Sequence, residues 1–110
     1  MNNKYLLCEA QLKSKTLDQH VIDLIDDEVN SVLDQTTYKY HKLKPNHSDY
    51  VKVTLKSKLR DLHISIVELA DIGQALDKIY NKTKSKNFSI RYSNNMTVQD
   101  LINQYSKIYP

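Results

Sequence analysis

The sequence predicts an α+β domain in which two long amphipathic helices and a C-terminal helix pack with a small antiparallel sheet. Two observations carry this prediction. Apolar residues recur at spacings of three and four in three separate stretches, and short stretches rich in β-branched and aromatic residues lie between them. A chain of 110 residues is too short to divide into two stable cores, so we expect a single domain over residues 1–110.

The strongest helical pattern runs from Thr16 to Gln35. Thr16 is a natural N-cap, and Gln19 stands at the third helical position, where the two residues have the spacing of a capping box. The spacings place one apolar face along this helix, which needs other side chains to cover it. That face consists of Leu17, Val21, Leu24, Ile25, Val29 and Val32.

Two further helices are expected, one over residues 58–82 and one beginning at Thr97. Gly73 lies on the apolar stripe of the first of these, where a residue without a side chain favours close approach of another part of the chain. Thr97 and Asp100 have the capping-box spacing at the start of the second. The stripe over 58–82 consists of Leu59, Leu62, Ile66, Leu69, Gly73, Leu76 and Tyr80.

Three stretches favour strands, namely residues 36–43, 50–55 and 88–93. Turn-forming residues at 44–49 separate the first two, which predicts a hairpin between them. Residues 4–12 are compatible with a strand or a helix. As a strand they would complete the β-α-β-β-α-β order of a ferredoxin-like arrangement, followed by a helix.

An all-α helical bundle is the alternative fold. The spacing of three and four extends back from residue 58 to Ser48, and a helix from there would replace the strand at 50–55. We rank this alternative second because Val51, Val53 and Thr54 are poor helix formers, and because the helix would be about three times the usual length.

The composition favours a cytoplasmic protein. Cys8 is the only cysteine, which excludes a disulfide within the chain and suits a reducing compartment. The sequence shows neither a signal-peptide pattern nor an apolar run long enough to cross a membrane. We therefore expect no membrane partner.

The sequence contains no recognisable motif for catalysis, for a cofactor or for a metal ion. The four histidines form no known pattern with carboxylates or a nucleophile, and a single glycine is too few for a phosphate-binding loop. We therefore expect a non-catalytic interaction or accessory protein that acts by protein–protein binding, with a homodimer among the candidate assemblies. The stripe from Leu59 to Tyr80 is its candidate apolar surface, if the fold leaves that stripe exposed.

Charge is segregated along the chain. Residues 1–35 carry three basic residues against seven acidic ones, whereas residues 36–60 carry seven basic residues against one acidic residue. Residues 61–77 carry four acidic residues and no basic one. Acidic residues on the polar side of the first helix are either a solvated face or an electrostatic docking surface for a partner. As candidate protein-interaction residues they are Asp23, Asp26, Asp27 and Glu28.

The basic segment supports an alternative function, that of a small basic nucleic-acid-binding protein with a Tyr/Lys-rich hairpin. Aromatic rings beside positive charges suit unpaired bases and phosphates. Because nearly all of this charge is Lys, such binding would show little sequence preference. The candidate nucleic-acid contacts are Tyr38, Lys39, Tyr40, Lys42, Lys44, Tyr50, Lys52, Lys56, Lys58 and Arg60.

Overall fold

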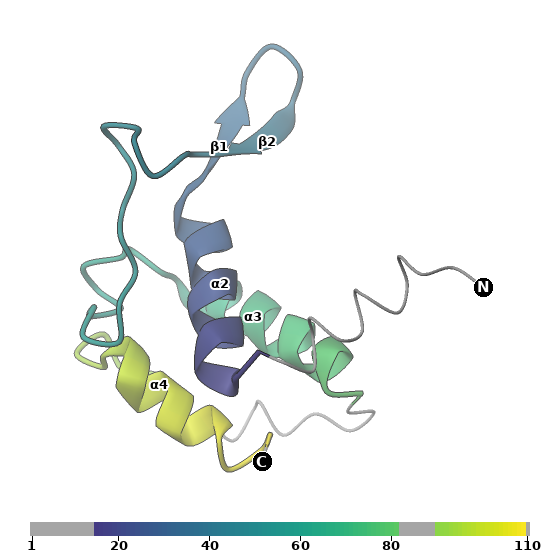
Figure 1. Cartoon of the computed structure of the whole chain (residues 1–110), viewed down its shortest axis with the longest axis vertical. Helices are drawn as coiled ribbons and strands as arrows, with labels where there is room; N and C mark the ends of the chain where they lie inside the picture. The colour runs from purple at the N-terminus through teal and green to yellow at the C-terminus, as the bar shows by residue number, and fades with distance from the viewer. Residues whose placement is uncertain (1–14, 82–89, 110) are drawn as a thin grey trace.

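Three helices and one β-hairpin make up the described part of the chain (Figure 1). The computed structural model describes residues 15–81 and 90–109. In chain order these residues form helix α2 (Leu17–Val29), strands β1 (Ser31–Asp34) and β2 (Lys39–Lys42), helix α3 (Ile66–Ile79) and helix α4 (Val98–Tyr105). The predicted α+β class is therefore confirmed. None of these helices has the length and apolar character needed to cross a membrane.

Side-chain oxygens cap the first turn of each helix, where backbone N–H groups lack a carbonyl partner. The Thr16 hydroxyl accepts the N–H of Gln19 at 3.2 Å at the start of α2. Ser65 caps α3. Thr97 and Asp100 form a complete capping box at the start of α4. The predicted starts of α2 and α4 are thus confirmed.

Two helices are shorter than the apolar pattern predicted. Helix α2 ends at Val29 instead of Gln35, because the chain leaves the helix at Asn30 and continues as β1. Helix α3 begins at Ile66 instead of residue 58. The preceding residues 59–64 form turns that bury their apolar side chains, so the spacing of three and four reflects burial without a helix there.

One strand of the predicted sheet is present, but its partner is a different stretch of the chain. Strand β2 lies within the predicted stretch 36–43, but it pairs with residues 31–34 in an antiparallel register from Ser31↔Lys42 to Asp34↔Lys39. Residues 50–55 form neither a strand nor a helix, so the predicted second hairpin strand and the alternative long helix from Ser48 are both wrong. Residues 90–93 form no strand either, whereas 4–12 and 88–89 lie outside the described residues.

Asp34 sets the turn that closes the hairpin. Its carboxylate accepts the backbone N–H of Thr36 at 2.8 Å, and its carbonyl accepts that of Tyr38 at 2.8 Å. The N–H of Thr36 holds the pKa of Asp34 below its ordinary value. Tyr38 has φ of 55°, in the left-handed region that side chains with a Cβ seldom adopt. The hairpin therefore closes at residues 35–38, whereas the predicted turn at 44–49 does form but leads from β2 to residues that are not a strand.

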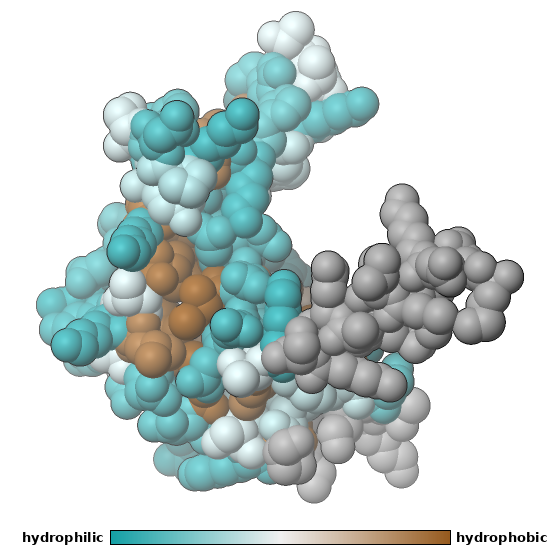
Figure 2. All heavy atoms as spheres, in the orientation of Figure 1, coloured by the Kyte–Doolittle hydropathy of each residue, from teal (hydrophilic) through white to brown (hydrophobic). Residues whose placement is uncertain are grey.

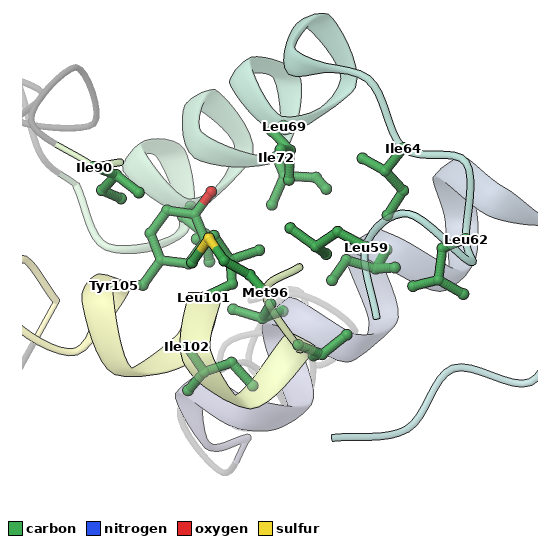
Figure 3. Packing of buried hydrophobic residues seen from close by; sticks show 14 of the residues in the cluster. Leu59, Leu62, Ile64, Leu69, Ile72, Ile90, Met96, Leu101, Ile102 and Tyr105 are labelled. Carbon is green, nitrogen blue, oxygen red and sulfur yellow. The ribbon is translucent and has the colours of Figure 1, made fainter. Parts of the chain in front are cut away.

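One hydrophobic cluster joins the helices. Figure 3 shows Leu59, Leu62 and Ile64, from the turns before α3, in the same cluster as Leu69 and Ile72 of that helix. The cluster comprises Val21, Ile25, Val53, Leu59, Leu62, Ile64, Leu69, Ile72, Leu76, Ile90, Met96, Val98, Leu101, Ile102, Tyr105 and Tyr109.

Gly73 is also buried in α3, and the hydroxyl of Tyr109 donates to its carbonyl at 3.4 Å. Tyr109 can therefore approach the backbone of α3 at Gly73, where a larger side chain would block the approach.

Asn30 joins the end of α2 to the segment that follows the hairpin. Its side chain is 0% exposed. The amide oxygen accepts the N–H of Val51 at 2.8 Å, and the amide nitrogen donates to the carbonyl of Val51 at 2.9 Å and to Asp26 Oδ1 at 2.6 Å. These are the two hydrogen bonds that a neighbouring strand would offer Val51. At Val51, a side chain therefore takes the place of a partner strand.

Replacing Asn30 by Ala should lower the free energy of unfolding by about 2–3 kcal/mol, because both backbone groups of Val51 lose their partner inside the protein. Urea unfolding followed by circular dichroism measures the change. Asn94→Ala, at an exposed position whose backbone contact is kept, is the matched control and should stay within about 0.5 kcal/mol of the wild type. Equal effects of the two substitutions would contradict the role assigned to Asn30.

Candidate functional site

The β1–β2 hairpin stands clear of the helices and is uncovered by the described residues (Figures 1 and 2). All four residues of β2 are exposed. The apolar side chains of the hairpin are exposed as well, at 48% for Val32, 36% for Leu33, 79% for Tyr38 and 71% for Tyr40. An isolated two-stranded hairpin is marginally stable in water unless something packs on it. The exposed side chains are the ones that a partner would cover.

The strand register sorts the hairpin side chains onto two faces, because residues directly opposite each other point the same way. We call the side that carries the Leu33↔Tyr40 pair the hairpin face. The hairpin face consists of Ser31, Leu33, Tyr40 and Lys42, and the opposite face consists of Val32, Asp34, Lys39 and His41.

A pocket of about 630 Å³ lies between the hairpin face and the two long helices. Ser31 and Tyr40 line the pocket from the hairpin. The other lining residues are all carboxylates, and we call this site the acidic pocket. They are Asp27 and Glu28 of α2 and Glu68 and Asp71 of α3. The two helices thus bring together acidic residues that lie about 40 positions apart in the sequence.

Burial and the neighbouring carboxylates both act on the pKa of Glu28. Burial raises the pKa of Glu28 above its ordinary value of 4.5, and the neighbouring charges of Asp71, Glu68 and Asp27 raise it further. The charged form of Glu28 therefore costs free energy at neutral pH, and a cation in the pocket would relieve that cost.

Lys42 ties the hairpin to the end of α2. Its Nζ lies 2.8 Å from Asp26 Oδ2 and 2.7 Å from Asp27 Oδ1. Both hydrogen bonds raise the pKa of Lys42, and the one to Asp26 has the larger effect. The Tyr50 hydroxyl donates to Asp26 Oδ1 at 3.0 Å. Burial would raise the pKa of Asp26, but hydrogen bonds from Lys42, Asn30 and Tyr50 outweigh it and hold that pKa below its ordinary value.

The four acidic residues predicted for protein interaction have different places in the structure. Asp27 and Glu28 line the acidic pocket. Asp26 is engaged in the network with Lys42, and Asp23 pairs with Lys15 at 3.1 Å near the start of α2. Sequence analysis did not place Glu68 and Asp71 in a site, although the run of acidic residues over 61–77 contained the signal.

The basic residues predicted to contact nucleic acid do not lie on one face. Lys39 and Tyr40 are on opposite faces of the hairpin, and Lys42 and Tyr50 are hydrogen bonded to Asp26. Tyr38 lies in the turn. The remaining members are exposed or partly exposed along the following segment and are Lys44, Lys52, Lys56, Lys58 and Arg60. Nucleic-acid binding stays a prediction.

The apolar stripe proposed as an interaction surface lies mostly in the core. Leu59, Leu62, Leu69, Gly73 and Leu76 are buried. Two exposed apolar residues remain at the start of α3, Ile66 and Val67, each 72% exposed. Among the described residues, the exposed large apolar side chains are therefore on the hairpin, at the start of α3 and at Val51.

Lys42→Met should lower the free energy of unfolding by about 1 kcal/mol at pH 7, a modest amount because the Lys42 side chain is half exposed. The folded pKa of Asp26 is depressed, so this stabilisation is present above its ordinary value of 3.8 and is lost as the pH falls through the folded value. Urea unfolding of the wild type and the variant at pH 7 and near pH 3 measures the loss of unfolding free energy and its dependence on pH. The exposed Lys44→Met is the control, and a loss for Lys42→Met that is independent of pH would rule out the ion pair as its cause.

Glu28→Gln should raise the free energy of unfolding by about 0.5 kcal/mol at pH 7, because it removes one of four repelling charges. The folded pKa of Glu28 is raised, so the cost of its charge is absent below 4.5 and fully present above the folded value. The gain should therefore vanish on acidification. The exposed Asp61→Asn serves as a control, and a destabilised Glu28→Gln at pH 7 would show that the carboxylate is favourable in the pocket.

Within residues 15–81 and 90–109, no three His, Cys, Asp or Glu side chains are placed to hold a metal ion. Cys8 lies outside the described residues. Comparisons of the chain with protein-family models, with curated proteins and with solved structures find no match.

Proposed function

We propose that this protein is a non-catalytic interaction protein that binds a protein partner through the hairpin face and the acidic pocket beside it. The single observation that carries the proposal is the uncovered hairpin, whose apolar side chains find no cover among the described residues. Single exposed apolar residues are ordinary on protein surfaces. Four of them on one short hairpin are the pattern of a binding element.

The side chains of this surface suit a protein interface. Tyr is enriched among the residues that dominate binding energy, and Tyr40 stands on the rim of a pocket. Fully burying an exposed Leu side chain contributes about 1.5–3 kcal/mol, and Leu33, which is 36% exposed, would contribute the smaller part of that amount.

Val67 of α3 extends the apolar surface beyond the pocket. It precedes Asp71 by four residues, so the two lie on the same side of the helix. A partner would therefore contact apolar side chains on the hairpin side and on the α3 side of the acidic pocket. This arrangement is not the one expected of a surface that contacts only water.

A small basic nucleic-acid-binding protein is the second candidate function. The exposed lysines along residues 44–60 favour it. We rank it second because Lys42 and Tyr50 are already bonded to Asp26, and because the acidic pocket beside Tyr40 would repel phosphates. For either function we propose a cytoplasmic location, on the strength of the single cysteine.

Photo-crosslinking in the native cells tests the proposal. A photoreactive phenylalanine analogue at position 40 should give one or a few discrete covalent adducts with a protein, identified by mass spectrometry. The same analogue at position 103, which is exposed on α4, is the control and should give none of them. Leu33→Asp in the same chain should abolish the adducts by placing a charge on the hairpin face. A chain that forms no adduct from position 40, or the same adducts from both positions, would contradict the proposal.

A further inference from the structure

We infer that the partner of the hairpin face is a basic extended segment, one whose alternate side chains are Lys or Arg and enter the acidic pocket. This inference rests on the proposed function and names the chemistry of its partner. The argument combines the open edges of the hairpin, the charge of the pocket and the apolar groups around it.

The hairpin offers two strand edges for pairing. In the described part of the chain the sheet has two strands, so β1 and β2 each have one edge without a partner strand. An extended peptide binds such an edge through backbone hydrogen bonds, and its alternate side chains then point to one face of the sheet. Every second residue of a peptide added here would lie on the side of Leu33 and Tyr40, which is the side of the acidic pocket.

The pocket calls for positive charge on those residues. Lys42, the nearby cation, is already paired with Asp26 and Asp27. In the described part of the chain no Lys or Arg nitrogen forms an ion pair with Glu28, Glu68 or Asp71, which line the same pocket. A volume of about 630 Å³ accommodates more than one long side chain. Charge complementarity therefore selects a basic occupant over a neutral or acidic one.

The groups around the pocket suit Lys and Arg stems. These side chains lay their methylene groups along apolar surface while the charged end reaches a polar partner. Leu33 provides such a surface, and the ring of Tyr40 attracts a cation over its face. The intervening residues of the peptide would lie beside Val32 on the opposite face, which is 48% exposed and favours an apolar neighbour.

Binding of a defined peptide tests the inference. The probe is a dye-labelled, end-blocked heptapeptide of alternating Lys and Val, and fluorescence anisotropy follows its binding to the full chain at low salt. The wild type should bind it saturably and should not bind the Glu–Val counterpart. The double variant Glu68→Gln/Asp71→Asn should bind at least about tenfold more weakly. Asp49→Asn/Asp61→Asn changes the net charge equally at exposed positions and should cost less than about threefold.

Glu28→Gln gives an independent measurement should the double variant fail to fold. It removes one pocket charge from the other helix and should weaken peptide binding several-fold while the fold is kept. Equal weakening by the pocket variant and the control variant would overturn the inference, because binding would then follow net charge alone.

Two further outcomes would also overturn it. If light scattering shows a dimer that Glu68→Gln/Asp71→Asn disrupts, a second copy of the chain is the occupant. If position 40 crosslinks to a discrete partner while the Lys–Val peptide fails to bind, the partner is not basic, although the proposed function stands. If the analogue at position 40 gives no discrete adduct at all, the proposed function itself is contradicted.

Discussion

The buried amide of Asn30 is the contact on which the rest of the site depends. It terminates α2, pairs with both backbone groups of Val51 and donates to Asp26. Asp26 in turn holds Lys42 of β2 and the hydroxyl of Tyr50. One satisfied polar network therefore fixes where the helix stops, where the hairpin starts and how the following segment returns to the core.

The same network leaves the hairpin open. It anchors the base of the hairpin through charged and polar groups, so no apolar packing against the helices is needed to hold it in place. Tyr40 remains largely in solvent, and Leu33 partly so, beside a pocket whose carboxylates repel one another. Exposed apolar groups and uncompensated charge each oppose stability, and their coincidence at one place is typical of a binding site. A basic, partly apolar partner would relieve both.

Local signals in the sequence were sufficient for the helix starts. Thr16 and Thr97 each cap a helix by accepting the N–H of the residue three positions later. The apolar stripes of α2 and α4 face the core, as their spacing predicted. The end of α2 was missed because Val32 continues the helical spacing, although its side chain is exposed on β1. Asn30 is a residue type that often follows the last turn of a helix, but the contact that buries it is to Val51, 21 residues further on.

Long-range contacts explain the other errors. The β-branched residues at 50–55 favoured a strand, but no strand pairs with them, and at Val51 the side chain of Asn30 supplies the hydrogen bonds that a strand would have given. Two of the four acidic residues that line the acidic pocket were predicted from the sequence as interaction residues. Asp27 and Glu28 were in the predicted cluster, whereas Glu68 and Asp71 join them only through the packing of α3 on α2.

Hydrogen exchange at the backbone amide of Val51 tests the central claim most directly. If Asn30 takes the place of a partner strand, this amide should exchange as slowly as the amides in the middle of α2, and far more slowly than those of Lys44, Asn46 and Ser48. An amide of Val51 that exchanges at the rate of these three would contradict the account, because the network of Asn30 would then not hold the segment in the folded protein.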